Sequence, residues 1–92
     1  MNASEQFDYW KQKFINLDLY KNYQKKIEVF GGENLIVYRF HTKDDHFTCF
    51  KIDCFGNYEY EFSVWKLHEE DEYFPLTEEG FKQAVKYFEA RL

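Results

Sequence analysis

The sequence predicts an α+β domain in which one antiparallel sheet packs against helices. Apolar residues recur at helical spacing near both ends of the chain and at every second position between them. The connections between the alternating segments are too short for the crossover that parallel strands need. Ninety-two residues suit one domain and leave no room for a second core. We therefore expect a single domain, 1–92, with a four-stranded antiparallel meander in the order α(α)ββββα.

We expect aromatic residues to form most of the hydrophobic core. They make up 23% of the chain, with 11 Phe, 8 Tyr and 2 Trp. Each such side chain removes roughly 150–250 Å² from water when it is buried. A short chain buries a smaller share of its surface than a long one, so dense core residues matter here. We expect the domain to fold without a metal or a disulfide.

A first helix is predicted near the N-terminus, where apolar residues recur at spacings of three and four. Ser4 precedes the stripe as the expected N-cap. A second short helix is expected to begin at Asn16 or Asp18 and to end at Lys25-Lys26. The apolar stripe consists of Phe7, Trp10, Phe14 and Leu17.

Four strands are predicted by alternation of apolar and polar residues. Gly31-Gly32 follows the first of them and is the expected hairpin turn, because glycine readily adopts positive φ angles. If the even-numbered side chains from Tyr38 to Val64 point inward together, one face of the sheet forms the core. The alternating residues are Ile27 and Val29, then Ile36, Tyr38 and Phe40, then Phe50, Ile52 and Cys54, and finally Tyr58, Tyr60, Phe62 and Val64.

The turn at 55–57 sets the register of the third and fourth strands. A three-residue loop pairs Ile52 with Tyr60 and places Lys51 opposite Glu61. A two-residue loop would move charged side chains onto the apolar face, since a slip of one residue exchanges the faces. We therefore predict the three-residue loop.

The C-terminal helix has the strongest local signals in the chain. Thr77 is the expected N-cap, and Glu78 and Glu79 follow at the positive end of the helix. The stripe expected to face the sheet consists of Phe81, Ala84, Val85, Phe88 and Leu92.

The reverse face of the predicted sheet is unusually apolar. An antiparallel sheet with one solvated face normally carries polar residues there. We expect the N-terminal helices to cover this face; the alternative is an exposed apolar patch with a charged rim, of the kind that marks partner sites. Its apolar residues are Leu35, Val37, Phe47, Cys49 and Trp65, and Arg39, Lys51, Glu59 and Glu61 surround them.

No constellation in the sequence predicts a metal site, a cofactor site or a catalytic site. His41, His46, Cys49 and Cys54 lack the tight spacing of zinc knuckles. Both cysteines lie on one predicted strand but point to opposite faces, so we expect one in the core and one on the reverse face. The carboxylate runs lie on exposed segments, where nothing raises a pKa for acid–base catalysis. We do not expect an enzyme.

Charge is divided unevenly along the chain, whose net charge is −5. Residues 1–43 carry seven Lys/Arg and five Asp/Glu, whereas residues 44–92 carry five and twelve. The second half would repel phosphates and anionic lipid and attract a basic partner. We therefore expect no direct nucleic-acid binding and no membrane association. The N-terminal sequence has no signal-peptide pattern, so the expected compartment is the cytoplasm.

We therefore predict a small acidic protein-binding module, most simply a stoichiometric inhibitor or adaptor that docks a basic partner surface. In size and acidity it resembles toxin-immunity proteins and phage-encoded inhibitors of host defence, although no motif carries that resemblance. The alternatives are a homo-oligomeric accessory subunit, which would pair with itself, and a small-ligand binder or enzyme. The expected partner-binding residues are Val37, Phe47, Glu59, Glu61, Trp65, Glu69, Glu70, Asp71, Glu72, Tyr73 and Phe74.

Overall fold

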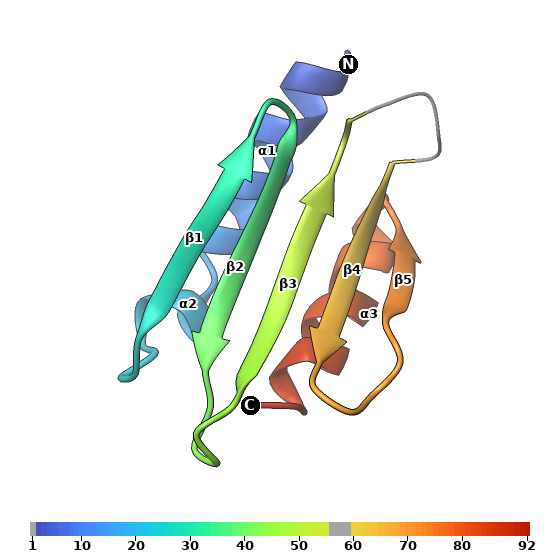
Figure 1. The fold of residues 1–92 in the computed structure, drawn as a ribbon. Helices are drawn as coiled ribbons and strands as arrows, with labels where there is room; N and C mark the ends of the chain where they lie inside the picture. Colours follow the sequence, from blue (N-terminus) through green and yellow to red (C-terminus); the bar gives the residue numbers. More distant parts are fainter. Residues whose placement is uncertain (1, 56–59) are drawn as a thin grey trace.

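The computed structural model describes residues 2–55 and 60–92, and its fold is α+β with a single antiparallel sheet (Figure 1). This confirms the predicted class and the helix at each end, but the sheet has five strands, not four. The order of the strands in the sheet, β1-β2-β3-β4-β5, follows the chain. The helices are α1 (Ala3–Ile15), α2 (Asp18–Lys21) and α3 (Glu78–Glu89). The strands are β1 (Ile27–Gly32), β2 (Leu35–His41), β3 (Phe47–Asp53), β4 (Glu61–Lys66) and β5 (Glu72–Pro75).

All three helices lie behind the sheet in the view of Figure 1, on the same face. α1 contacts β3, and α3 contacts β3, β4 and β5. Glu78 at the start of α3 accepts hydrogen bonds from Tyr9 and Lys13 of α1, which joins the two long helices. The helix layer and one sheet face therefore enclose a single core.

Phe14 is at the centre of that core. Its ring stacks on Tyr38 at 4.5 Å and on Phe50 at 4.4 Å between centroids, and it has no exposed surface. Phe88 of α3 approaches Phe50 edge-on at 5.5 Å. The predicted inward alternation is confirmed. The described even-numbered apolar residues of β2, β3 and β4 face the helices and are buried, and the one exception among them is Ile36 at the start of β2, which is partly buried. The buried ones are Tyr38, Phe40, Phe50, Ile52, Phe62 and Val64, and Cys54 follows β3 on the same side.

The helix ends follow the sequence in part. Thr77 caps α3 as predicted, with its Oγ1 accepting from Gly80 N at 3.0 Å. The N-cap of α1 is Asn2, whose Oδ1 accepts a hydrogen bond from Glu5 N at 2.9 Å. The prediction of Ser4 as the N-cap was therefore wrong by two residues. Both side chains can cap, and the apolar stripe begins far enough downstream to allow either. α2 is shorter than expected, because it ends at Lys21.

The first hairpin turns at Glu33-Asn34 and not at Gly31-Gly32. Gly32 pairs with Leu35, so both glycines belong to β1. Asn34 takes the positive φ of the turn, at 57°. Asparagine tolerates this region better than other residues with a side chain. Glycine was therefore not needed there, and the prediction was wrong.

The register of β3 and β4 differs from the prediction by two residues. Ile52 pairs with Phe62 and Lys51 with Ser63, so Glu61 lies opposite Asp53. A shift of two leaves every side chain on its predicted face, so the apolar pattern cannot distinguish the two registers. The predicted Tyr58 pairing lies outside the described residues. The missed strand, β5, pairs Phe62 with Phe74 and Ser63 with Tyr73.

Candidate functional site

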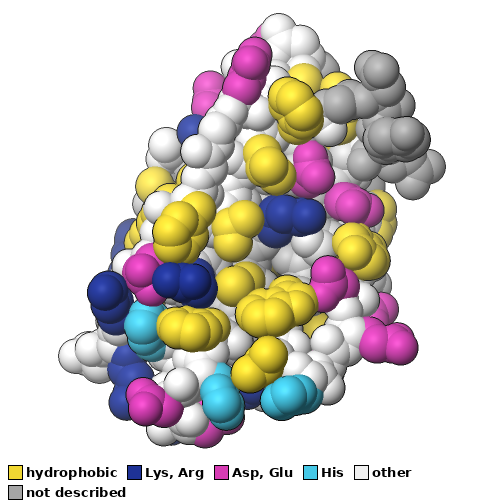
Figure 2. Space-filling model, in the orientation of Figure 1, with side chains coloured by type: hydrophobic (Ala, Val, Ile, Leu, Met, Phe, Trp, Pro, Cys, Tyr) yellow, Lys and Arg dark blue, Asp and Glu magenta, His cyan; other side chains and the backbone are white. Residues whose placement is uncertain are grey.

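The face of the sheet opposite the helices is uncovered by any described helix or strand (Figure 1). The expectation that α1 and α2 cover it was wrong. The Phe7, Trp10 and Phe14 stripe packs into the same core as α3, and a helix with one apolar stripe can cover only one surface. Figure 2 shows this side, with apolar side chains spread over the strands. We call it the open face, and its side chains come from Glu28, Phe30, Leu35, Val37, Arg39, His41, Phe47, Cys49, Lys51, Asp53, Glu61, Ser63, Trp65 and Tyr73.

A shallow hollow lies over β2, β3 and β4 on the open face. Trp65 forms one side of it, directly opposite Cys49 in the ladder, and 39% of its surface is exposed. Lys51 and Asp71 supply opposite charges at the margin of the hollow. Its volume is about 210 Å³, and its lining consists of Val37, Cys49, Lys51, Ser63, Trp65 and Asp71. This volume lies below the range of about 300–1,000 Å³ that is usual for small-molecule pockets.

Cys49 is half-buried at the floor of this hollow. Burial raises the pKa of its thiol, and Asp71 adds to the rise while Arg39 opposes it. A nucleophilic cysteine needs the opposite shift, because the thiolate is the reactive species. Cys54 lies on the other side of the sheet, and burial raises the pKa of its thiol to about 11. The placement of one cysteine in the core and one on the reverse face is confirmed.

A compact charged cluster occupies the β1 side of the open face. Glu28 Oε1 lies 2.9 Å from Arg39 Nη2 and 2.7 Å from His41 Nε2. The hydrogen bonds from His41 and Arg39 hold the pKa of Glu28 below its usual value. The Arg39 guanidinium also stacks over the rings of Phe30, at 4.8 Å, and Phe47, at 4.5 Å. Arg39 is thus paired with Glu28 and packed against two aromatic rings, so its own charge is not free on this face.

The opposite side of the open face is acidic. Between Glu61 and Glu72 the chain has five carboxylates and one lysine, Lys66. Glu61 lies on the open face next to Tyr73, and Asp71 accepts a hydrogen bond from Tyr73 Oη at 3.3 Å. Glu69 is engaged by Arg91 at 3.0 Å, whereas Glu70 is exposed. Glu72 pairs with Val64 and so points toward the helix side.

The structure therefore gathers most, but not all, of the predicted binding residues. Val37, Phe47, Glu61, Trp65 and Tyr73 share the open face, and Asp71 borders it. Phe74 does not, because its ring packs 5.7 Å from Tyr87 of α3 on the helix side. Glu59 lies outside the described residues. Phe30 was not among the predicted binding residues. It alternates with Val29 and Gly31, which point toward the helix side, and this alternation could have placed it on the open face.

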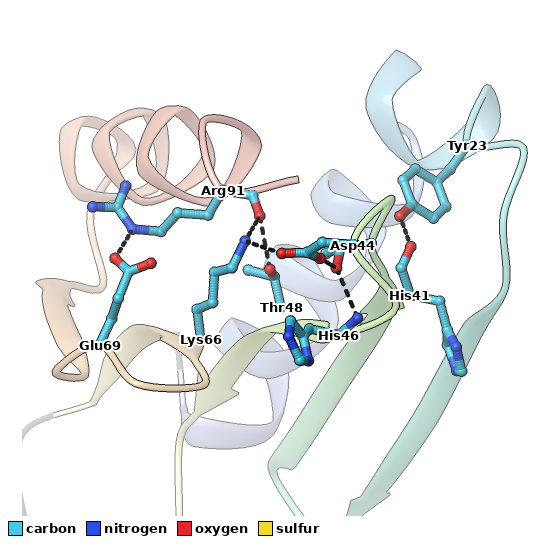
Figure 3. Close-up of polar contacts among 9 residues, drawn as sticks. Tyr23, His41, Asp44, His46, Thr48, Lys66, Glu69 and Arg91 are labelled. Carbon is cyan, nitrogen blue, oxygen red and sulfur yellow. Dashed lines mark hydrogen bonds and ion pairs between the residues drawn. The ribbon is translucent and has the colours of Figure 1, made fainter.

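At the end of the sheet that is lower in Figure 1, polar side chains contact the C-terminal residues of the chain (Figure 3). Thr48 Oγ1 and Lys66 Nζ both donate to the carbonyl oxygen of Arg91, each at 2.9 Å. Lys66 also lies 3.8 Å from Asp44, and Tyr23 donates to the carbonyl oxygen of His41. Among the residues described, no group of three or more His, Cys, Asp or Glu could hold a metal ion.

Comparison with family models, with curated proteins and with solved structures found no match for the chain. None of the helices in the described parts of the chain is long and apolar enough to span a bilayer.

Proposed function

We propose that this chain is a protein-binding module, a stoichiometric inhibitor or adaptor, that docks a basic surface of another protein on its open face. The observation that carries the proposal is the position of Trp65. It is a partly exposed tryptophan beside a hollow, in a sheet face that no described element covers. Tryptophan is among the residues most enriched at the energetic centres of interfaces.

The apolar part of the open face supports this role. Val37, Phe47 and Cys49 lie on neighbouring positions of β2 and β3, next to Trp65 on β4. Tyr73 extends the surface onto β5 and is 54% exposed. A contiguous apolar patch with a polar rim is typical of a partner site, whereas isolated apolar residues are normal on any surface.

Charge complementarity defines the partner's chemistry. Arg39 is paired with Glu28, whereas Lys51, near the centre of the open face, has no ion pair among the described residues. Glu61, Glu70 and Asp71 form no ion pair among the residues that the structure describes. A partner with lysine or arginine around an apolar anchor would complement this arrangement, and the charges would accelerate its association.

The test uses a partner captured with the tagged protein and then purified. Binding is measured by calorimetry or surface plasmon resonance for the wild type, Trp65→Ala and the double variant Glu61→Lys/Glu70→Lys. We expect a 1:1 complex that Trp65→Ala weakens about tenfold or more. The double variant should slow association, and added salt should reduce that difference.

Two substitutions on the helix side serve as matched controls. Tyr9 is an aromatic residue with the same exposed fraction as Trp65, 39%, but it lies on α1. Glu89 is an exposed carboxylate on α3. Tyr9→Ala and Glu89→Lys should therefore leave affinity unchanged. A partner whose affinity is insensitive to Trp65→Ala but falls with either control would overturn the proposal, as would the failure of any partner to bind saturably.

A further inference from the structure

The two edges of the sheet are unlike. β5 has four residues, ends in Pro75 and is preceded by the carboxylates 69–71. Short length, proline and charge are the features by which edge strands avoid pairing with other chains. β1 has six residues and no proline, and no described strand or helix lies on its outer side (Figure 1). Among the described strands, β1 alone is left as an open edge.

The backbone of β1 presents hydrogen-bonding groups at this edge. His41 N donates to Lys26 O at 3.0 Å, so residue 26 directs its backbone groups toward β2. In an antiparallel ladder this direction alternates from residue to residue. The even-numbered residues of β1 are therefore bonded to β2, and Ile27, Val29 and Gly31 direct their N–H and C=O groups outward.

Apolar side chains flank the edge on both faces of the sheet. Val29 points toward the helix side and is 51% exposed, and Phe30 points to the open face and is 47% exposed. Both are among the most exposed large apolar residues in the described parts of the chain. A strand that pairs along this edge would cover both, on opposite sides of the new ladder.

The charges at the two ends of β1 are complementary to those of a second β1 strand that runs antiparallel to it. Lys25 and Lys26 precede the strand, and Glu33 follows it in the hairpin turn. All three side chains are exposed. In an antiparallel pair of identical strands, the basic start of each lies beside the acidic end of the other. A parallel pair would instead bring like charges together.

We propose that β1 pairs antiparallel with β1 of a second copy of this chain, with Val29 on the two-fold axis. In this register Val29 forms backbone hydrogen bonds with the partner's Val29. Ile27 does so with the partner's Gly31, and Gly31 with the partner's Ile27. Lys25 then lies opposite the partner's Glu33. If the register between the two β1 strands is shifted by two residues in one direction, Glu28 lies opposite the partner's Glu28. If it is shifted in the other direction, Lys25 no longer lies opposite the partner's Glu33. Charge thus favours the central register.

The assembly closes at two copies, because each copy has one open edge and its β5 edge is protected. The two-fold axis of an antiparallel strand pair runs perpendicular to the sheet. Both open faces therefore point to the same side of a ten-stranded sheet and stay uncovered, so the inference is independent of the proposed function.

Sedimentation equilibrium over a wide concentration range tests the pairing. We expect the wild type to pass from monomer to dimer. Val29→Pro should remain monomeric, because proline removes an outward N–H and blocks the edge without breaking the β1–β2 ladder. Circular dichroism and thermal melting check that Val29→Pro folds. A wild type that stays monomeric at about 1 mM, where even weak specific contacts form, overturns the inference.

A charge exchange tests the register without altering the backbone. Lys25→Glu and Glu33→Lys should each weaken the dimer about three- to tenfold, because each places like charges together at both ends of the paired strands. The double variant Lys25→Glu/Glu33→Lys restores opposite charges and should return the dissociation constant to within about twofold of the wild type. Trp65→Ala is the control and should leave the dimer intact. A dimer that Trp65→Ala weakens while the charge variants do not would belong to the open face, and would overturn pairing through β1.

Discussion

Cys49 lies directly opposite Trp65 across the β3–β4 ladder, and both side chains point away from the helices. The other tryptophan, Trp10, is 5% exposed on α1 and stacks on Phe81 at 5.3 Å. One tryptophan thus belongs to the core and the other to the open face. Their different settings allow stability and surface function to be measured separately.

The first prediction compares the two tryptophans by chemical denaturation. Trp10→Ala should lower the free energy of unfolding by about 3–5 kcal/mol, the usual loss for a large buried aromatic side chain. Trp65→Ala should lower it by about 1 kcal/mol, because much of that side chain already faces water. Equal losses for the two variants would mean that the open face is covered in solution.

The second prediction uses Cys49 as a chemical probe of the open face. A thiol reagent at pH 8 should modify Cys49 before Cys54, because Cys54 is 2% exposed and its pKa is raised to about 11. Mass spectrometry of peptides identifies the modified residue. A partner bound at the open face should slow modification of Cys49, whereas pairing of two copies through β1 should not. Equal rates for both thiols in the folded protein would contradict the assignment of Cys54 to the core.

The sequence predicted the side-chain faces of the central strands correctly, because the period-two pattern depends only on parity. It could not fix the β3–β4 register, since a shift of two residues preserves every face. β5 was missed because only Phe74 of its four residues faces the core, and four residues are too few to show alternation.

The open face was recognisable from the sequence, but its exposure was not. The apolar stripe of α1 fits either surface of the sheet, and the sequence contains no signal for which surface a helix will choose. In the structure, Phe14 fits between Tyr38 and Phe50, beside Phe88, and that shared packing places α1 next to α3. The choice is therefore a tertiary one, made by the complementarity of rings distant in the sequence.

The third prediction concerns the close approach of α3 to the end of β5. A methyl group at Gly80 would lie 1.9 Å from the carbonyl oxygen of Pro75. Alanine in a helix is normally more stable than glycine by about 1 kcal/mol. Here Gly80→Ala should destabilise the protein by about 1–3 kcal/mol, because the backbone of the β5–α3 connection must shift.

Gly32→Ala is the control for this effect, since no atom beyond its two chain neighbours lies within 4 Å of the added methyl group. Its stability should change by less than about 0.5 kcal/mol. Thermal melting of both variants gives the comparison. If Gly80→Ala melts at or above the wild-type temperature, the end of β5 does not lie against the start of α3.

The fourth prediction is the pH dependence of the α1–α3 link. Hydrogen bonds from Lys13 and then Tyr9 hold the pKa of Glu78 below its usual value of 4.5. A carboxyl whose pKa is lower in the folded state binds protons more readily in the unfolded state. Its contribution to stability is therefore complete above the unfolded pKa and is lost as the pH falls through the folded pKa.

Glu78→Gln should consequently destabilise the protein at pH 7, and its difference from the wild type should shrink steadily below about pH 4.5. Glu79→Gln is the matched control, because Glu79 lies in the same first turn of α3 and shares its position near the positive helix end. Its carboxylate accepts a hydrogen bond from Gln83 Nε2 within α3 and none from α1 among the described residues. Urea denaturation at closely spaced pH values from 3 to 7 measures both differences. If Glu78→Gln differs from the wild type by the same amount at pH 3 as at pH 7, the Lys13–Glu78 contact does not contribute to the folded state, and packing alone holds α1 against α3.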